Sequence, residues 1–336
     1  MKAVFFYRKP YDDHYSIENV FDTVIRSLPK NVQAQKVVLP FISRGIFPRL
    51  FNIIFAAFKQ GDINHITGDV HYIAFFMRKK KTVLTIHDCG FLVQNHSPLA
   101  KWIIKLFWFR MPVLRSSVVI ADSEKTKKDI LDITNCSPSK ITVIPVPVDE
   151  RFKYIPRKFN KRSPTLLQIG TKPNKNLPRV IRAIKNIPCV LHIVSSHNKT
   201  LVTRLKKSKI CYKIFSNLTN EEIIDKYANC DVVIFTSLSE GFGMPTIEAN
   251  AVGRPVVTSN LSPMKEVAGS AACLVDPYNI DEIKKGILKI INNANYRNEL
   301  VRKGLKNAKR FGPKKIAGTY YLLYKKMEKA NNARTQ

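Results

Sequence analysis

Several features that would assign this sequence to other classes of protein are missing from it. Its apolar runs fall short of the roughly 18 residues of a membrane-spanning helix, and the opening residues, MKAVFFYRKPYDD, hold too short an apolar run for a signal peptide. The cysteines are scattered, and no two are separated by the two residues typical of a metal or redox site. We therefore expect a cytoplasmic protein with reduced thiols, either free or attached to the inner face of the plasma membrane.

Acidic residues are also scarce. The sequence has 25 Asp and Glu against 56 Lys and Arg, a formal net charge of +31. Such a surplus favours an anionic partner, which could be nucleic acid, an anionic membrane or a phosphorylated substrate, although a generally Lys-rich composition would also produce it. Because no nucleic-acid-binding motif is found, we expect no nucleic-acid partner. A basic scaffold that grips nucleic acid or membrane without catalysis is the alternative.

The 336 residues suffice for two domains of about 100–200 residues each. Short apolar runs alternate with helical patterns in both halves, which predicts two α/β domains with parallel sheets. The basic, Pro-containing stretch 149–163 is predicted to link them. The predicted strands are residues 3–7, 82–86, 117–121 and 141–145 in the first half, and residues 165–169, 190–195, 231–235 and 255–258 in the second.

The most informative segment, SEGFGMPTIEA at 239–249, follows one of these strands. Gly241 and Gly243 allow the backbone to turn sharply and approach a ligand. Pro245 suits the first turn of a helix, where its missing N–H is not needed. A helix that begins there directs N–H groups and a partial positive charge outward, as in many diphosphate sites.

Two carboxylates, Glu240 and Glu248, stand on either side of this helix start. Because carboxylates and phosphate are both negatively charged and repel each other, we do not expect both glutamates to contact the phosphate groups. They are better suited to accept hydrogen bonds from hydroxyl groups on either side of a diphosphate. A nucleotide sugar offers that arrangement, whereas a helix-start Glu that merely stabilises the helix dipole is the structural alternative.

This segment resembles the paired-glutamate motif of glycosyltransferase family 4. The resemblance implies an α/β, GT-B fold, in which two Rossmann-like domains with parallel sheets face each other across a cleft. Residues 1–153 would form the acceptor-binding domain and residues 154–316 the nucleotide-sugar-binding domain. Residues 317–336 would form a C-terminal helix that returns to the N-terminal domain and ends in a disordered tail.

The resemblance also implies roles for individual residues. Glu240 would hold hydroxyls of the transferred sugar and Glu248 the ribose hydroxyls. In the segment after strand 165–169, Lys175 matches the lysine that would neutralise the leaving diphosphate, and Thr171 stands where the family often has Arg. The candidate donor-binding residues are Gly170, Thr171, Lys172, Gly241, Phe242, Gly243, Met244, Pro245, Thr246 and Glu248.

A histidine, His87, ends the strand predicted at 82–86, and the family has a histidine at this place near donor sugar and acceptor. A neutral imidazole there could hydrogen-bond a sugar hydroxyl or assist proton transfer. A histidine with a structural role is the alternative, and the adjacent Asp88 could orient the ring. The candidate catalytic residues are therefore His87, Glu240 and Lys175.

By resemblance, the activity is retaining transfer of a sugar from a UDP- or GDP-sugar to a glycan or lipid-linked acceptor, in bacterial surface polysaccharide or lipopolysaccharide biosynthesis. The sequence contains no Asp-x-Asp triplet, which metal-dependent glycosyltransferases usually need. We therefore expect metal independence and no cofactor. Another GT-B enzyme, such as a nucleotide-sugar epimerase, is a further alternative.

Two segments, 41–59 and 97–115, mix aromatic residues with Lys and Arg. This composition is typical of helices that lie in a membrane interface. Aromatic residues are also common in protein cores. If these side chains lie at the surface, we expect peripheral contact with an anionic membrane; if they are buried, they form part of the first domain's core.

Overall fold

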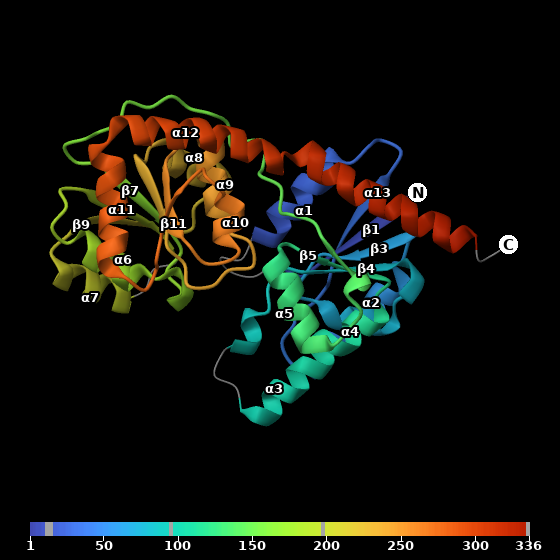
Figure 1. Ribbon diagram of the computed structural model, residues 1–336. Helices are drawn as coiled ribbons and strands as arrows, with labels where there is room; N and C mark the ends of the chain where they lie inside the picture. The colour runs from blue at the N-terminus through green and yellow to red at the C-terminus, as the bar shows by residue number, and fades with distance from the viewer. Residues whose placement is uncertain (11–15, 94–96, 196–198, 334–336) are drawn as a thin grey trace. The chain divides into compact units, whose positions relative to one another are not determined.

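The computed structural model describes residues 1–10, 16–93, 97–195 and 199–333, and it divides the chain into two compact units. Unit 1 comprises Met1–Pro147 and Pro313–Gln336, and unit 2 comprises Val148–Gly312. Each unit contains a six-stranded parallel sheet with helices packed around it (Figure 1). The prediction of two α/β units with parallel sheets is confirmed.

The sheet of unit 1 has the strand order β2-β1-β3-β4-β5-β6. The strands at residues 2–7, 82–86 and 118–121 are largely apolar because helices cover both faces of a parallel sheet. The strands are β1 (Lys2–Tyr7), β2 (Gln33–Val38), β3 (Ile63–Ile66), β4 (Thr82–Ile86), β5 (Val118–Ala121) and β6 (Ile141–Val143). The helices are α1 (Ser16–Ser27), α2 (Ile46–Phe58), α3 (Pro98–Ile104), α4 (Met111–Arg115), α5 (Glu124–Thr134) and α13 (Pro313–Asn332). Shorter helical turns are η1 (His71–Phe76), η2 (Lys79–Lys81), η3 (Gly90–Val93), the π-helical η4 (Lys105–Arg110) and η5 (Pro138–Lys140).

The sheet of unit 2 has the order β12-β11-β10-β7-β8-β9. Its strands are β7 (Thr165–Ile169), β8 (Val190–Val194), β9 (Cys211–Phe215), β10 (Val232–Phe235), β11 (Val256–Ser259) and β12 (Cys273–Val275). Its helices are α6 (Leu177–Ile184), α7 (Lys199–Ser208), α8 (Asn220–Ala228), α9 (Met244–Val252), α10 (Met264–Ala268), α11 (Ile280–Asn292) and α12 (Ala294–Ala308), with η6 (Pro173–Lys175) and η7 (Lys309–Phe311). The strand order reverses between β7 and β10, so a topological switch point lies between these two strands.

The division between the units falls after Pro147 and after Gly312, whereas the sequence predicts boundaries at 153/154 and 316/317. The linker-like stretch is attached to unit 2 by its backbone. The Val148 N–H donates to the Phe311 carbonyl at 2.9 Å, and the Ile155 N–H donates to the Val252 carbonyl at 3.3 Å. Its polar, Pro-containing composition conceals these contacts, which is why the sequence suggests a free linker.

Helix α13 returns the chain to unit 1. Tyr324 and Tyr320 are buried, and the Tyr324 hydroxyl lies 2.6 Å from Nδ1 of His65 on β3. Pro313 occupies the helix start, which explains why the helix begins earlier than predicted. The tail predicted to be disordered after Lys329 is helical as far as Asn332, and residues 334–336 lie outside the described residues.

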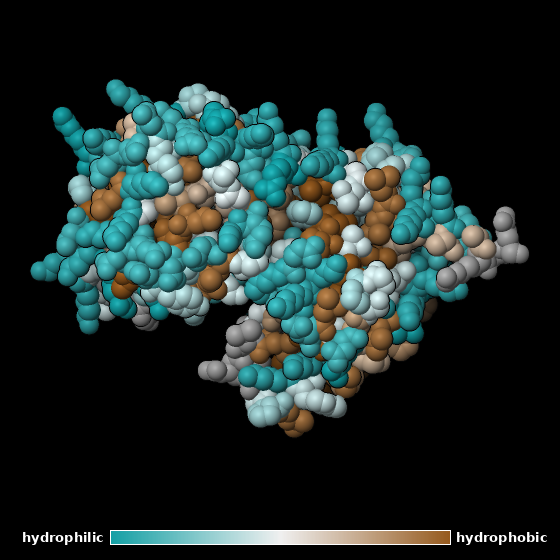
Figure 2. Space-filling model, in the orientation of Figure 1, coloured by the Kyte–Doolittle hydropathy of each residue, from teal (hydrophilic) through white to brown (hydrophobic). Residues whose placement is uncertain are grey.

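Hydrophilic side chains cover much of the surface seen in Figure 2, as the surplus of basic residues requires. Brown, hydrophobic side chains emerge between them in places. Within the described part of the chain, no helix is both long and apolar enough to cross a membrane.

Candidate active site

The two segments singled out in unit 2 meet at the switch point of its sheet. Gly170 directly follows β7, and the segment 236–243 connects β10 to α9. Because β7 and β10 are hydrogen-bonded neighbours, both segments leave the sheet at the same edge. Ligands of open α/β sheets bind at such a point, beyond the carboxyl ends of the strands.

Lys175 and Glu240 form an ion pair across this edge, with 2.7 Å between Nζ and Oε1. Both side chains are largely buried, at 19% and 15% exposed. The Lys175 ammonium also lies 5.1 Å from the centre of the Phe235 ring. The sequence predicts these two residues as partners of the same ligand, and the structure brings them together.

Asn174, which the sequence analysis does not single out, ties the two loops together. Its side-chain amide donates to the Ser239 carbonyl at 2.9 Å and to Oε1 of Glu240 at 3.3 Å, while its backbone carbonyl accepts from the Leu238 N–H at 2.8 Å. Asn is common in polar loops, so only the folded structure reveals this role. The position of the Glu240 carboxylate is therefore fixed by two donors.

A glycine is required at the end of β7. Gly170 has φ of +81°, and a Cβ placed there would lie 3.2 Å from Cε of Lys175. The lysine stem thus packs along the bare backbone at this point. The next two residues lie on the same loop: the Thr171 hydroxyl hydrogen-bonds to that of Ser195 at the end of β8, and Lys172 is exposed.

Helix α9 begins as predicted, with Gly243 at its N-cap and Pro245 in its first turn. No side chain caps this end of the helix. Gly243 has φ of +108°, and a Cβ there would lie 3.3 Å from the Phe235 ring, so a larger residue is disfavoured. Gly241, Phe242, Met244 and Thr246 lie in the same turn, with Phe242 packed edge-on against Phe311 at 5.5 Å.

Buried hydroxyl groups without a protein partner lie around this turn. Ser237 Oγ and Thr246 Oγ1 are both buried and make no hydrogen bond within the structure. Buried polar groups are normally satisfied, so an unpartnered hydroxyl indicates a place for water or ligand. Together with the uncapped helix start, they make this edge rich in donors.

The second glutamate, Glu248, is half-buried on α9 and accepts a hydrogen bond from the Tyr227 hydroxyl at 2.5 Å. Burial raises the pKa of Glu248 to about 7, although the Tyr227 hydrogen bond and the charge of Lys175 both lower it. Lys175 is therefore within electrostatic reach of both glutamates. Tyr227, on α8, was not anticipated, because nothing in the sequence links it to α9.

If Glu248 holds the ribose of a nucleotide-sugar donor, as the resemblance implies, Tyr227→Phe should weaken donor binding mainly at low pH. Removing the hydroxyl takes away a contact that lowers the pKa of Glu248, so the carboxylate should become protonated at higher pH. Below neutral pH the KM for the donor should rise by up to about tenfold, which is the size of effect expected from losing one hydrogen bond to a charged group. The kcat should change little. KM measured against pH for both proteins checks this, and a KM effect that does not vary with pH would contradict it.

In unit 1, residues from four neighbouring strand ends gather around His87. Nδ1 of His87 lies 2.7 Å from Oδ2 of Asp122 after β5, and Nε2 lies 2.7 Å from the Thr67 carbonyl oxygen after β3. Arg8, after β1, pairs with Glu18 at 2.8 Å and with Asp69. Asp122 therefore belongs to the site, and Asp88, the orienting residue considered from the sequence, instead accepts from the Gly90 N–H.

The contacts of His87 favour a charged ring, in contrast to the neutral imidazole that the sequence suggests. Both partners accept hydrogen bonds, so both ring nitrogens carry a hydrogen while Asp122 is ionised. Burial lowers the pKa of His87, but Asp122 outweighs it and the pKa rises to about 9. Gly68, with φ of +133°, leaves room for this ring, since a Cβ there would lie 2.6 Å from it.

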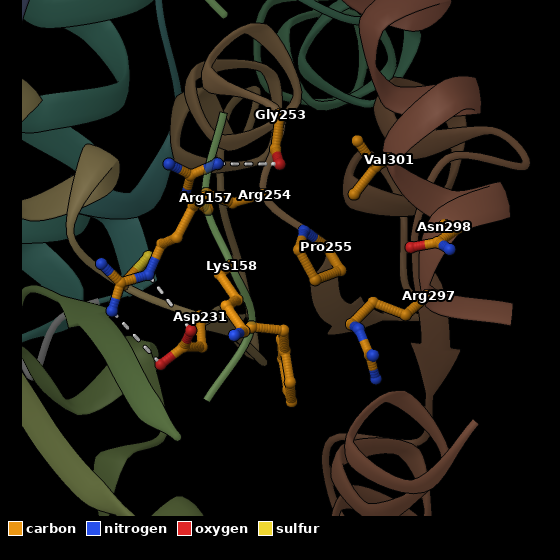
Figure 3. A pocket seen from close by; sticks show the side chains of 11 residues that line it. Arg157, Lys158, Asp231, Gly253, Arg254, Pro255, Arg297, Asn298 and Val301 are labelled. Atoms are coloured by element: carbon orange, nitrogen blue, oxygen red, sulfur yellow. Dashed lines mark hydrogen bonds and ion pairs between the residues drawn. The ribbon is translucent and has the colours of Figure 1, made fainter. Parts of the chain in front are cut away.

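A separate pocket of about 330 Å³ lies at the opposite, amino end of the unit 2 strands (Figure 3). Arginine side chains line it, but protein groups already engage them. Arg157 pairs with Asp231 at 3.1 Å, and Arg254 donates to backbone carbonyls, including that of Ala228 at 2.6 Å. None of the candidate donor-binding residues lines this pocket, so we place the active site at the carboxyl edge of the sheet.

Comparison with known families agrees with this geometry. Residues 18–152 match the model of "Glycosyltransferase Family 4", and residues 151–307 match that of "Glycosyl transferases group 1". The chain is a glycosyltransferase, since the two matches together span residues 18–307. Unit 2, with Lys175 and the two glutamates, falls almost entirely within the second of these matches.

Curated relatives of this glycosyltransferase include the O-antigen chain mannosyltransferase B of Escherichia coli, 27% identical over 70% of this chain and 67% of that protein. The serotype-specific mannosyltransferase WbdA of the same species is 23% identical over 69% of this chain, but the matched region is 32% of WbdA. Among solved structures, HepE of Anabaena, in complex with UDP and glucose, has a TM-score of 0.79 at 16% identity, covering 97% of this chain and all of that one. Sucrose-phosphate synthase of Thermosynechococcus elongatus has a TM-score of 0.78 at 14% identity, covering 98% and 100%. These structures establish the GT-B fold.

Proposed function

We propose that this glycosyltransferase moves a hexose, with mannose the favoured sugar, from a nucleotide sugar to a glycan or lipid-linked acceptor during assembly of a bacterial surface polysaccharide. The observation that carries the proposal is the Lys175–Glu240 pair beside an uncapped helix start at the sheet's switch point. The names of the O-antigen mannosyltransferases support the sugar and the setting. The HepE complexes with UDP and UDP-glucose support a nucleotide-sugar donor.

Donor binding would exchange partners within the ion pair. The diphosphate would lie against the start of α9, and Lys175 would turn from Glu240 toward its oxygens. Glu240 would then be free to accept hydrogen bonds from sugar hydroxyls, while Glu248 would accept those of the ribose. In the free protein, the ion pair thus holds both side chains close to the positions that they would take in the donor complex, which reduces the rearrangement needed on binding.

Transfer would proceed with retention at the anomeric carbon. The bond between that carbon and the diphosphate oxygen breaks, and Lys175 with the helix N–H groups stabilises the charge that develops on the leaving group. The acceptor hydroxyl forms the new bond on the same face, and its proton passes to a diphosphate oxygen. No carboxylate nucleophile is required. We propose that His87, whose two ring nitrogens bond Asp122 and the Thr67 carbonyl, assists the transfer through its positive charge.

We propose that the transfer reaction needs no metal ion. Within the described residues, no three His, Cys, Asp or Glu side chains form a group that could hold a metal ion. The diphosphate charge would instead be balanced by Lys175 and the α9 helix start.

A thermal-shift panel of UDP-, GDP- and ADP-sugars, run with a chelator, tests the proposal. One donor should raise the melting temperature, because it binds only the folded state. That donor should then be consumed at an appreciable rate only when an acceptor glycan is present. No shift with any donor would overturn the donor site. Isomerised donor without acceptor would indicate an epimerase, and turnover that needs a divalent ion would refute metal independence.

A further inference from the structure

Helix α2 of unit 1 turns an apolar face to the solvent. Its buried residues Asn52, Ile53 and Ala56 occupy one side, and large apolar residues occupy the other. Phe47 is 76% exposed and Phe58 is 84% exposed. The exposed residues recur at helical spacing and form a single stripe: Ile46, Phe47, Leu50, Phe51, Ile54 and Phe58.

The stripe continues onto neighbouring elements of the same unit. Arg49 on α2 stacks over Trp108 of η4 at 5.4 Å, and Phe75 of η1 contacts Phe107 of η4 at 6.4 Å. Trp102 on α3, just before η4, is 56% exposed. We call the whole set the exposed apolar surface; beyond the stripe it comprises Phe41, Ile42, Phe76, Leu99, Trp102, Ile103, Phe107 and Leu114. Brown side chains are visible in Figure 2 over the part of unit 1 that contains α3 and α4.

This concentration of exposed apolar side chains is local. Elsewhere in the described part of the chain, the large apolar side chains that are exposed are Val38, Tyr154, Ile155, Tyr278 and Leu322. Scattered exposed residues of that kind are normal, whereas a contiguous set marks an interaction site.

The charge around the exposed apolar surface selects its partner. The segments 41–59, 70–81 and 97–115, which carry this surface, contain no Asp or Glu. Their basic residues are Arg44, Arg49, Lys59, Arg78, Lys79, Lys80, Lys81, Lys101, Lys105, Arg110 and Arg115. A second copy of the chain would bring the same cations against one another, at a Coulomb cost. An anionic bilayer offers an apolar interior and negative headgroups together.

We propose that the exposed apolar surface docks on an anionic lipid bilayer. Helix α2 would lie along the interface with its stripe among the acyl chains, and the surrounding Lys and Arg would contact the headgroups. The exposed Trp102 suits the headgroup level, where aromatic rings concentrate. This inference goes beyond sugar transfer and does not depend on it.

Flotation of the full chain with lipid vesicles tests the apolar part of the proposal. Wild type should float with vesicles that contain phosphatidylglycerol, and much less with pure phosphatidylcholine. The double variant Phe47→Glu/Phe51→Glu should lose at least about tenfold in vesicle partitioning, because two apolar side chains no longer enter the bilayer. As the matched control, Leu322→Glu changes an exposed residue of α13 in the same unit and should partition as wild type.

A second set of variants tests the charge. Arg44→Gln/Lys101→Gln/Lys105→Gln should weaken binding to anionic vesicles about tenfold or more, since each cation near the surface contributes to the attraction. Lys206→Gln/Lys207→Gln/Lys285→Gln removes the same charge from exposed residues of unit 2 and should have much less effect. High salt should reduce wild-type binding for the same reason.

Tryptophan fluorescence gives a readout that does not depend on flotation. Emission of the wild type should shift to shorter wavelength on anionic vesicles, and Trp102→Phe should lose most of that shift. Equal binding to neutral and anionic vesicles, or equal loss in the Leu322→Glu control, would overturn the proposal. The proposal would also be overturned if the wild type bound no vesicles but formed a concentration-dependent dimer, and if Phe47→Glu/Phe51→Glu abolished that dimer. The donor-induced thermal shift should be unchanged in every variant, so failure here leaves the donor site standing.

Discussion

Replacing Lys175 with methionine should lower kcat for sugar transfer by about 100- to 1,000-fold, the usual effect of removing one group that stabilises developing charge. The charge on the departing diphosphate grows in the transition state, so the loss should fall on kcat more than on the donor KM. Methionine keeps most of the stem that packs against Gly170. Steady-state kinetics with the donor found in the thermal-shift panel measures both constants.

Variants at three other positions test whether the loss of activity is specific to Lys175. Lys185→Met changes an exposed lysine at the far end of α6 and should leave kcat unchanged. Lys172→Met, three residues before Lys175 on the same loop, should cost much less than Lys175→Met. Glu240→Gln should also lower activity, and the double variant with Lys175→Met should lose less than the two single losses multiplied, because the pair is in direct contact. An equal loss in Lys172→Met would move the diphosphate contact to that residue.

Most strands that were predicted from the sequence, namely β1, β4, β5, β10 and β11, are buried at nearly every residue. β4 and β7 have the bounds expected, because their apolar runs end sharply at polar residues. The strands that were missed have other patterns. β2 and β9 lie at sheet edges and have few buried residues, β12 is an edge strand of only three residues, and β3 buries the polar His65, whose partners Tyr324 and Thr85 come from distant segments. Apolar periodicity cannot reveal a strand that is stabilised in this way.

The candidate site was predictable where the chemistry is local in the sequence. The glycines, the helix start and the charged residues of unit 2 follow from two short segments. Tyr227 and Asn174 were missed because their partners lie on other elements, 21 and 66 residues away. The charge of His87 was missed for the same reason, since its hydrogen-bond acceptors follow β3 and β5. A residue type at a strand end indicates a site, but only its partners determine its protonation.

Replacing Asp122 with asparagine should remove a pH-dependent part of the stability. The pKa of His87 is about 9 in the folded protein, above its ordinary value of 6.5, so the folded state binds the proton more tightly than the unfolded chain. The resulting stability is fully present below about pH 6.5 and is lost as the pH rises through 9. The shift alone corresponds to about 3 kcal/mol. The net effect should be smaller, because burial raises the pKa of Asp122 and so opposes its ionisation.

The melting temperature between pH 6 and pH 10, measured for both proteins, checks this. Wild type should lose stability across the alkaline half of that range more steeply than Asp122→Asn, in which His87 has no carboxylate partner. Asp88→Asn serves as the control, because this exposed neighbour bonds the Gly90 N–H and not the imidazole. Its profile should follow the wild type. If the positive charge of His87 assists the transfer, the alkaline limb of activity should also move to lower pH in Asp122→Asn, whereas an unmoved limb would assign His87 a purely structural role.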